Sequence, residues 1–207
     1  MSLREPDVAS RGVNPNSDLR ESVCDAWTVD DPLDSWETLP RRVYLDTNTL
    51  QTIFDYAGQI WENETFVPAD RDKTVPDLED DIQALGELMA VNQRAGFEFV
   101  VTEASLSEVS ARREPLYLQW VLDVLDVWIV QSGGEKPAPP RIQRIGSVSS
   151  KDWNLLRDAL AYRCDAFLTM ERRLFSQAPV IEHRTRLRIL RPTTYWHCLR
   201  PWAALYR

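Results

Sequence analysis

Four acidic side chains of this sequence stand beside stretches that are typical of buried strands and of the helices next to them. They are Asp46, Glu108, Asp152 and Glu171. Because the carboxyl ends of parallel strands meet at one edge of a sheet, we expect these side chains to gather there. Clustered carboxylates repel one another unless a cation lies between them, and Mg²⁺ and Mn²⁺ prefer oxygen ligands. The four acids together therefore predict a divalent-metal site.

Each acid taken alone also has a structural explanation. Asp46 would cap the helix that follows it, and Ser105 with Glu108 would form a capping box. Asp152 would balance a helix dipole, and Glu171 would be an exposed acid in a first helical turn. The metal site is favoured by the joint pattern and not by any one residue.

The segments that must position these acids alternate between strands and helices. The expected strands are the short apolar runs 42–46, 97–101, 166–169 and 187–190. The expected helices are 47–57, 78–94, 102–113, 151–163 and a last amphipathic helix around 195–202. Residues 116–130 are so apolar that we expect them to be largely buried, as a helix or as a helix that runs into a strand. This alternation predicts an α/β fold, a Rossmann-like three-layer α/β/α arrangement with a central, mainly parallel sheet.

Local signals mark several of the expected helix ends. Gly96 is expected to stop the helix over 78–94, and Thr102 to cap the next one. Pro115 is well placed to start the apolar segment, since proline favours the first helical position. Either Ser149 or Ser150 is expected to cap the helix over 151–163.

Charge is distributed unevenly along the chain. Residues 1–40 hold nine acids and three arginines, whereas residues 171–207 hold eight arginines and two acids. We expect residues 1–38 to form an acidic extension, partly disordered or docked, and residues 39–207 to form the domain. The arginine-rich end is a candidate surface for anionic ligands, with Arg172 and Arg173 as candidate substrate-binding residues. The alternative is a solvated face whose arginines pair with acids elsewhere.

Other function classes find little support in the composition. No apolar run reaches the roughly 20 residues of a membrane helix and no signal-peptide centre is present, so we expect a cytoplasmic protein. The three cysteines are widely spaced and are expected to be free thiols, with Cys164 in the core. His183 and His197 lack the spacing of a triad or a zinc site, and there is no glycine-rich phosphate loop.

Two segments carry a resemblance to a known family. The first is Val-Tyr-Leu-Asp-Thr-Asn at 43–48, an apolar strand that ends on an acid. The second runs from the helix that begins at Asp152, through Cys-Asp-Ala at 164–166, to Thr-Met-Glu at 169–171. Over residues 41–191 the chain resembles the PIN-domain family of metal-dependent nucleases.

The resemblance implies a function and roles for particular residues. Asp46, Glu108, Asp152 and Glu171 would hold Mg²⁺ or Mn²⁺ and catalyse the hydrolysis of RNA phosphodiester bonds by in-line attack of water. Groups expected to orient the ligands are Thr47, Asn48, Thr169 and Asp158. Asp158 points to another side of its helix from Asp152, so it could instead bond Arg157 or Arg163, or hydrogen-bond near Asn48. Many small proteins of this family are toxins held by antitoxins, and self-association is a further expectation.

Two alternatives remain open at this point. Glu171 stands where the family more usually has aspartate, and a PIN-like fold with a drifted site would act as a scaffold that binds RNA or a protein partner. The segment Leu-Asp-Thr-Asn-Thr-Leu at 45–50 also bears a superficial likeness to the phosphatase loop of haloacid dehalogenases. In that case Asn48 would replace the general acid, which makes a phosphatase the weaker alternative.

Overall fold

The structure of this chain is a computed structural model, and it describes residues 36–124, 129–131 and 137–206. The chain divides into two compact units, Met1–Thr38 and Leu39–Arg207. In the first unit, the described part is the short 3-10 helix η2 (Trp36–Thr38). The acidic extension expected over residues 1–38 lies almost entirely outside the described residues and stays a prediction.

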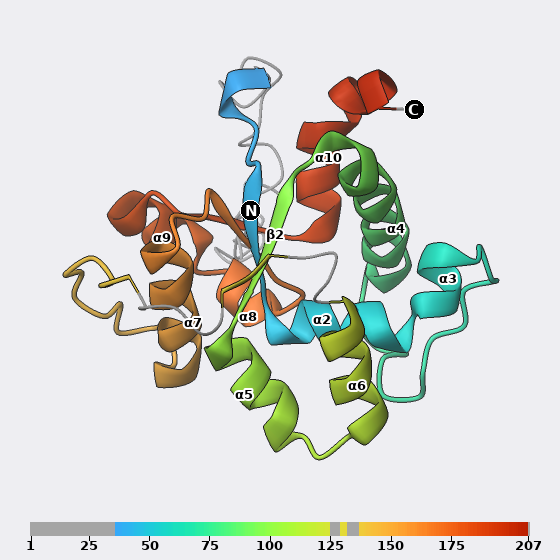
Figure 1. The fold of residues 1–207 in the computed structure, drawn as a ribbon, viewed down its shortest axis with the longest axis horizontal. Helices are drawn as coiled ribbons and strands as arrows, with labels where there is room; N and C mark the ends of the chain where they lie inside the picture. Colours follow the sequence, from blue (N-terminus) through green and yellow to red (C-terminus); the bar gives the residue numbers. More distant parts are fainter. Residues whose placement is uncertain (1–35, 125–128, 132–136, 207) are drawn as a thin grey trace, which may run out of the picture. The chain divides into compact units, whose positions relative to one another are not determined.

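A five-stranded, all-parallel sheet forms the centre of the second unit (Figure 1). Its strands are β1 (Arg42–Leu45), β2 (Glu98–Thr102), β3 (Ile129–Gln131), β4 (Ala166–Leu168) and β5 (Arg188–Leu190). They lie in the order β3-β2-β1-β4-β5, and every neighbouring pair runs parallel. The predicted α/β fold with a parallel central sheet is confirmed, because each expected strand forms close to its expected position.

Helices cover both faces of this sheet, as parallel strands require. They are α2 (Thr47–Asp55), α3 (Ala57–Trp61), α4 (Leu78–Ala95), α5 (Glu103–Ala111), α6 (Pro115–Val124), α7 (Ser150–Ala161), α8 (Arg172–Phe175), α9 (Ala178–Thr185) and α10 (Pro192–Ala203), followed by the 3-10 turn η3 (Ala204–Tyr206). Figure 1 shows α4 and α10 on one side of the sheet and α7 and α9 on the other. This is the three-layer arrangement that the sequence predicts.

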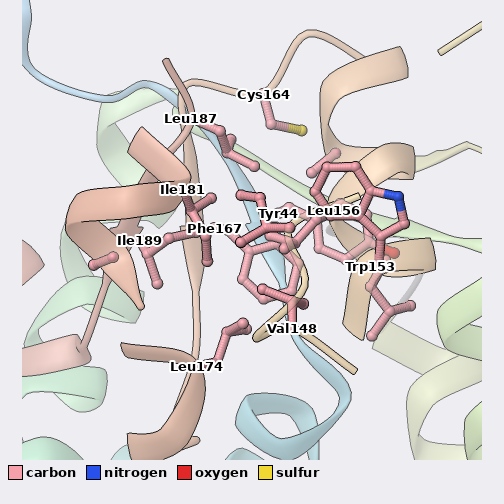
Figure 2. Close-up of a cluster of buried hydrophobic side chains, with 14 of the residues drawn as sticks. Tyr44, Val148, Trp153, Leu156, Cys164, Phe167, Leu174, Ile181, Leu187 and Ile189 are labelled. Carbon is pink, nitrogen blue, oxygen red and sulfur yellow. The ribbon is translucent and has the colours of Figure 1, made fainter. Parts of the chain in front are cut away.

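One row of buried side chains runs across four strands on the α7 and α9 side of the sheet. Val100, Tyr44, Phe167 and Ile189 lie next to one another in strand register, and all belong to one buried cluster (Figure 2). The rings of Tyr44 and Phe167 stack with their centroids 5.1 Å apart. Each such side chain contributes roughly 1.5–3 kcal/mol when fully buried, so this row fixes the register of the strands that carry the site.

The structure confirms most of the expected helix ends. Gly96 ends α4 in the left-handed conformation at φ 63°, and α6 begins at Pro115. Ser149 is the cap of α7, and its side chain accepts a hydrogen bond from the backbone of Asp152. Thr102 precedes α5 at the cap position but makes no side-chain cap bond, because its hydroxyl is used elsewhere.

The expectation that residues 116–130 are largely buried is wrong for the described helix α6. Leu116 is 79% exposed and Leu122 is 44% exposed, whereas Tyr117 and Val121 are buried. The two buried residues are four apart, so the helix buries one stripe and leaves the rest in solvent. Because most residues of this segment are apolar, the spacing of the buried ones could not be recognised in the sequence. Residues 125–128 lie outside the described residues, and β3 follows them.

Two further expectations concern cysteine and the membrane. Cys164 is buried, as predicted, and burial raises the pKa of its thiol to about 12. Within the described residues Cys164 and Cys198 form no disulfide bond, and Cys24 lies outside those residues. Within the described ranges, no helix is long and apolar enough to cross a membrane.

Candidate functional site

The candidate site lies where the strand order changes direction. From β1 the chain proceeds to β2 and β3 on one side and returns to β4 and β5 on the other. In open α/β sheets the ligand crevice forms beyond the carboxyl ends of the two strands at such a point. Asp46 follows β1 there, and Thr169 follows β4. The backbone N–H of Asp46 donates to Leu168 at 3.0 Å, which ties the two strand ends together.

Asp46 is 4% exposed, and hydroxyl groups are its side-chain partners. Thr169 Oγ1 donates to Asp46 Oδ2 at 2.7 Å, and Thr47 Oγ1 lies 3.5 Å from Oδ1. The Thr169 oxygen in turn accepts from the backbone N–H of Glu171 at 3.0 Å. In the described part of the chain, no lysine or arginine forms an ion pair with Asp46. Its charge is therefore oriented but not neutralised.

The electrostatic environment of Asp46 disfavours its ionised form. The pKa of its carboxyl is raised from 3.8 to about 6, chiefly by burial and to a lesser extent by the charges of Glu171 and Glu108. The hydrogen bond from Thr169 acts in the opposite direction and lowers it. A buried acid that faces two other acids is unfavourable as pure structure, and perturbed groups of this kind mark functional sites.

Glu108 lies on α5 and shares a hydroxyl group with Asp46. Thr47 Oγ1 donates to Glu108 Oε2 at 2.8 Å, so Thr47 stands between the two carboxylates. Lys151 Nζ lies 3.1 Å from the same Glu108 oxygen. This lysine is largely exposed, so the ion pair is weak, and little free energy is needed to replace it by another contact of Glu108.

Glu171 is half-buried at the cap position of α8, so its reading as an exposed first-turn acid is wrong. Asn48 Nδ2 donates to Glu171 Oε2 in a long contact of 3.4 Å. Burial raises the pKa of Glu171, and the charge of Asp152 raises it further, whereas Lys151 and Arg173 lower it. Glu171 therefore interacts electrostatically with both Asp152 and Asp46.

Asp152 is also part of the cap of α7. Ser149 Oγ accepts from the Asp152 backbone N–H at 3.1 Å and donates to Asp152 Oδ2 at 2.6 Å. This reciprocal arrangement gives Asp152 a structural role at a helix start. Asp152 is partly exposed, so the cap leaves its carboxylate accessible to solvent.

A buried hydrogen-bond network lies below the acids and was not foreseen. The Tyr44 hydroxyl bonds Thr102 Oγ1 and Ser105 Oγ, both at 2.8 Å, and Thr102 Oγ1 donates to Asp158 Oδ2 at 3.1 Å. The capping box of Ser105 with Glu108 is wrong, because Thr102 occupies the cap position and Ser105 is buried inside α5. Asp158 is bonded to Thr102, which was not among the partners expected for it.

The two candidate substrate-binding arginines differ in their surroundings. Arg172 donates to the carbonyl of Pro76 and to Asp77 Oδ2, the latter at 3.2 Å, so it ties α8 to the loop before α4. Arg173 is exposed, and its charge lowers the pKa of Glu171. Arg173 is thus near the acids and accessible, whereas Arg172 is already engaged by an acid.

Two cationic side chains near the acids were missed by sequence reasoning. One is Lys151, the neighbour of Asp152 in the sequence, which pairs with Glu108. The other is Arg112, which donates to Gln51 Oε1 at 2.9 Å and to Asn48 Oδ1 at 3.2 Å. The spacing of Glu108 and Arg112, four residues apart on a helix, was the signal that could have revealed the second.

The donor chemistry of the site suits a hard divalent cation, although its acids are not gathered tightly. Among the residues that the structure describes, no group of three histidine, cysteine, aspartate or glutamate side chains converges closely enough to hold a metal ion. The acids nevertheless act on one another electrostatically, and their oxygens are suitable ligands for a hard cation. The buried carboxylate of Asp46 has no cationic partner in the described part of the chain.

Comparisons of this chain with protein-family models, with curated proteins and with solved structures find no match.

Proposed function

We propose that this protein is a metal-dependent endoribonuclease that hydrolyses phosphodiester bonds of single-stranded RNA. One observation carries the proposal: the buried carboxylate of Asp46 stands at the reversal of strand order, within electrostatic reach of Glu108 and Glu171. A divalent cation would offset the repulsion that such a cluster creates. The resemblance of residues 41–191 to PIN-domain nucleases makes RNA the proposed substrate.

The side chains around the acids have distinct tasks in this proposal. The groups that would hold Mg²⁺ or Mn²⁺ are Asp46, Glu108, Asp152 and Glu171. The bound ion would supply an activated water and stabilise charge on the scissile phosphate. Thr169 and Thr47 fix the orientation of the Asp46 carboxylate, and Asn48 restrains Glu171. Burial of Asp46 strengthens the interaction of its charge with a cation, because little water competes for it.

A second candidate is a scaffold that binds RNA without cleaving it. The observation that favours it is the ion pair of Lys151 with Glu108, which neutralises one of the four acids without a metal. Glu171, which stands where the family more usually has the shorter aspartate, also favours a scaffold. In this case the arginines near the sheet edge would bind RNA, and the acids would not act on it.

The decisive experiment compares wild type with Asp46→Asn on labelled single-stranded RNA. The wild type should cleave in Mg²⁺ or Mn²⁺, and chelation should abolish the activity. Asp46→Asn should lower the rate by roughly 100-fold or more, since even groups that only support a metal ligand are worth 10–100-fold. Melting curves without RNA give a second readout: Mn²⁺ should raise the melting temperature of wild type and not of Asp46→Asn.

Asp80→Asn is the matched control, because it removes the same charge from the exposed surface of α4. It should leave both cleavage and the response to Mn²⁺ unchanged. If wild type and Asp46→Asn leave RNA equally intact while both bind it, the nuclease proposal fails and the scaffold is the better account.

A further inference from the structure

Arg112 lies beside the acids and is held there by neutral groups. It directly follows α5, four residues after Glu108, so the two side chains project from the same side of the helix. Its Nη1 donates to Gln51 Oε1 at 2.9 Å, and its Nη2 donates to Asn48 Oδ1 at 3.2 Å. In residues 36–124, 129–131 and 137–206, no carboxylate forms an ion pair with this guanidinium.

Two other partly buried arginines have acidic partners. Arg191 is bound by Asp81, and Arg42 by Glu98 at 2.9 Å. Arg112 is likewise half-buried, but it bonds two amide oxygens, which orient its charge without neutralising it. A partly desolvated charge with no counter-ion binds an incoming anion with less competition from water.

The acid that Arg112 reaches through Gln51 does not compensate the charge of the guanidinium. Gln51 connects Arg112 to Asp55, because Gln51 Nε2 donates to Asp55 Oδ1 at 2.9 Å. Asp55 is itself paired with Arg71. Asn48 makes the second connection, since it accepts from Arg112 and donates to Glu171. One amide thus links the guanidinium to the acid cluster, which places a cation next to the proposed reaction centre.

We propose that Arg112 binds a backbone phosphate of the RNA next to the phosphate that is cleaved. The inference rests on the proposed function for the identity of the ligand. The guanidinium is planar, and its remaining N–H groups suit two oxygens of one phosphate. No ion pair has to break for this, since the bonds to Gln51 and Asn48 can persist while the phosphate binds. Arg112 therefore selects the phosphodiester backbone and positions it over the acids.

The test measures RNA binding without cleavage. The parent protein carries Asp46→Asn and is kept in EDTA, and a fluorescent single-stranded RNA of mixed sequence is titrated at several salt concentrations. Adding Arg112→Gln should weaken binding about 10-fold, because the variant loses a charge-assisted hydrogen bond to the phosphate. It should also lower the slope of log K against log salt by about 0.7, the value for one single-strand phosphate. Arg112→Lys should weaken binding less.

Arg113→Gln is the matched control, since it removes the same charge from the next residue, which is exposed. It should leave binding within about twofold of the parent. The inference is overturned if Arg112→Gln binds like its parent, if Arg113→Gln loses as much, or if affinity falls with an unchanged salt slope. The last result would mean that Arg112 only holds Asn48 in place.

Failure of this inference and failure of the nuclease proposal are separable. Metal-dependent cleavage by wild type, combined with RNA binding that ignores Arg112, would overturn the role of Arg112 and keep the nuclease. Binding that depends on Arg112, in a wild type that cleaves no RNA, would keep the phosphate site and overturn the nuclease. The melting temperature of each variant is measured as a control for correct folding.

Discussion

Two buried aspartates of this protein have opposite surroundings. Asp81 on α4 is 1% exposed, and Asp46 at the end of β1 is 4% exposed. Asp81 Oδ2 accepts from Arg191, with its Nε at 3.1 Å, and Oδ1 accepts from the backbone and hydroxyl of Thr193 at 3.2 and 2.9 Å. Asp46 accepts from the Thr169 hydroxyl and from the backbone of Thr47, and the nearby charges are those of Glu108 and Glu171.

The difference separates a charge that the fold compensates from one that it leaves uncompensated. The bonds of Asp81 join α4 to the start of α10, so its charge is used inside the fold. The charge of Asp46 is restrained in position, but nothing in the described part of the chain cancels it. Burial alone therefore says little about function, whereas the partners of a buried acid are informative.

The largest expected effect comes from removing the charge of Asp81. Asp81→Asn should lower the free energy of unfolding by about 3 kcal/mol, since it removes one partner of a buried ion pair and leaves Arg191 with the longer contact to the exposed Asp77, at 3.7 Å. Urea unfolding at pH 7 measures it. Asp80→Asn, one residue away and exposed, should stay within about 0.5 kcal/mol of wild type. Equal values for the two variants would show that Asp81 contributes no more than a surface acid.

The next effect concerns Asp46 and has the opposite sign. The pKa of its carboxyl rises from 3.8 to about 6 on folding, so the folded protein binds this proton more tightly than the unfolded chain does. The associated stability is complete below about pH 4 and is lost as the pH rises through about 6. At pH 8 without metal, Asp46→Asn should therefore be more stable than wild type, on the order of 2 to 3 kcal/mol.

Urea unfolding in EDTA between pH 4 and pH 8 measures this difference. The difference should be small at pH 4, close to the unfolded pKa of 3.8, because there the folded carboxyl is protonated and the unfolded one is only partly ionised. Asp81→Asn provides the contrast, because it should destabilise the protein at pH 8. A variant Asp46→Asn that is less stable than wild type at pH 8 would mean that the Asp46 charge is compensated in the fold.

Sequence patterns predicted the fold because its elements are local. Each expected strand is a short apolar run, and stop or cap residues such as Gly96 and Ser149 mark the ends of helices between the strands. The position of Asp46 beside Thr169 was predictable for the same reason, since both residues end neighbouring parallel strands. The exposure of Leu116 was not, because its segment is apolar on every side.

The side-chain partners around the acids could not be predicted in the same way. Whether Glu108 meets Lys151, or Asp158 meets Thr102, depends on how α5 and α7 are rotated about their axes and how closely they approach. That rotation follows from packing against the sheet, which no local pattern records. The comparison of Asp46 with Asp81 required these partners, so it could not have been made from the sequence.

The smallest expected effect concerns the hydrogen bond from Thr169 to Asp46. Thr169 donates to Asp46 and thereby lowers the pKa of the Asp46 carboxyl. Thr169→Val removes that bond at nearly constant volume, so the pKa should rise above about 6 by roughly 0.5 to 1, as expected for one hydrogen bond of about 1 kcal/mol. The experiment compares the single variant Thr169→Val with the double variant Thr169→Val/Asp46→Asn, in EDTA. The difference between their free energies of unfolding is measured as a function of pH, and the midpoint of its change reports the pKa of Asp46. Thr169→Ser retains the hydroxyl and should leave the midpoint where wild type has it. A midpoint that Thr169→Val leaves unmoved would show that this hydroxyl does not act on the charge of Asp46, and would leave burial and the neighbouring acids as the whole cause of its shift.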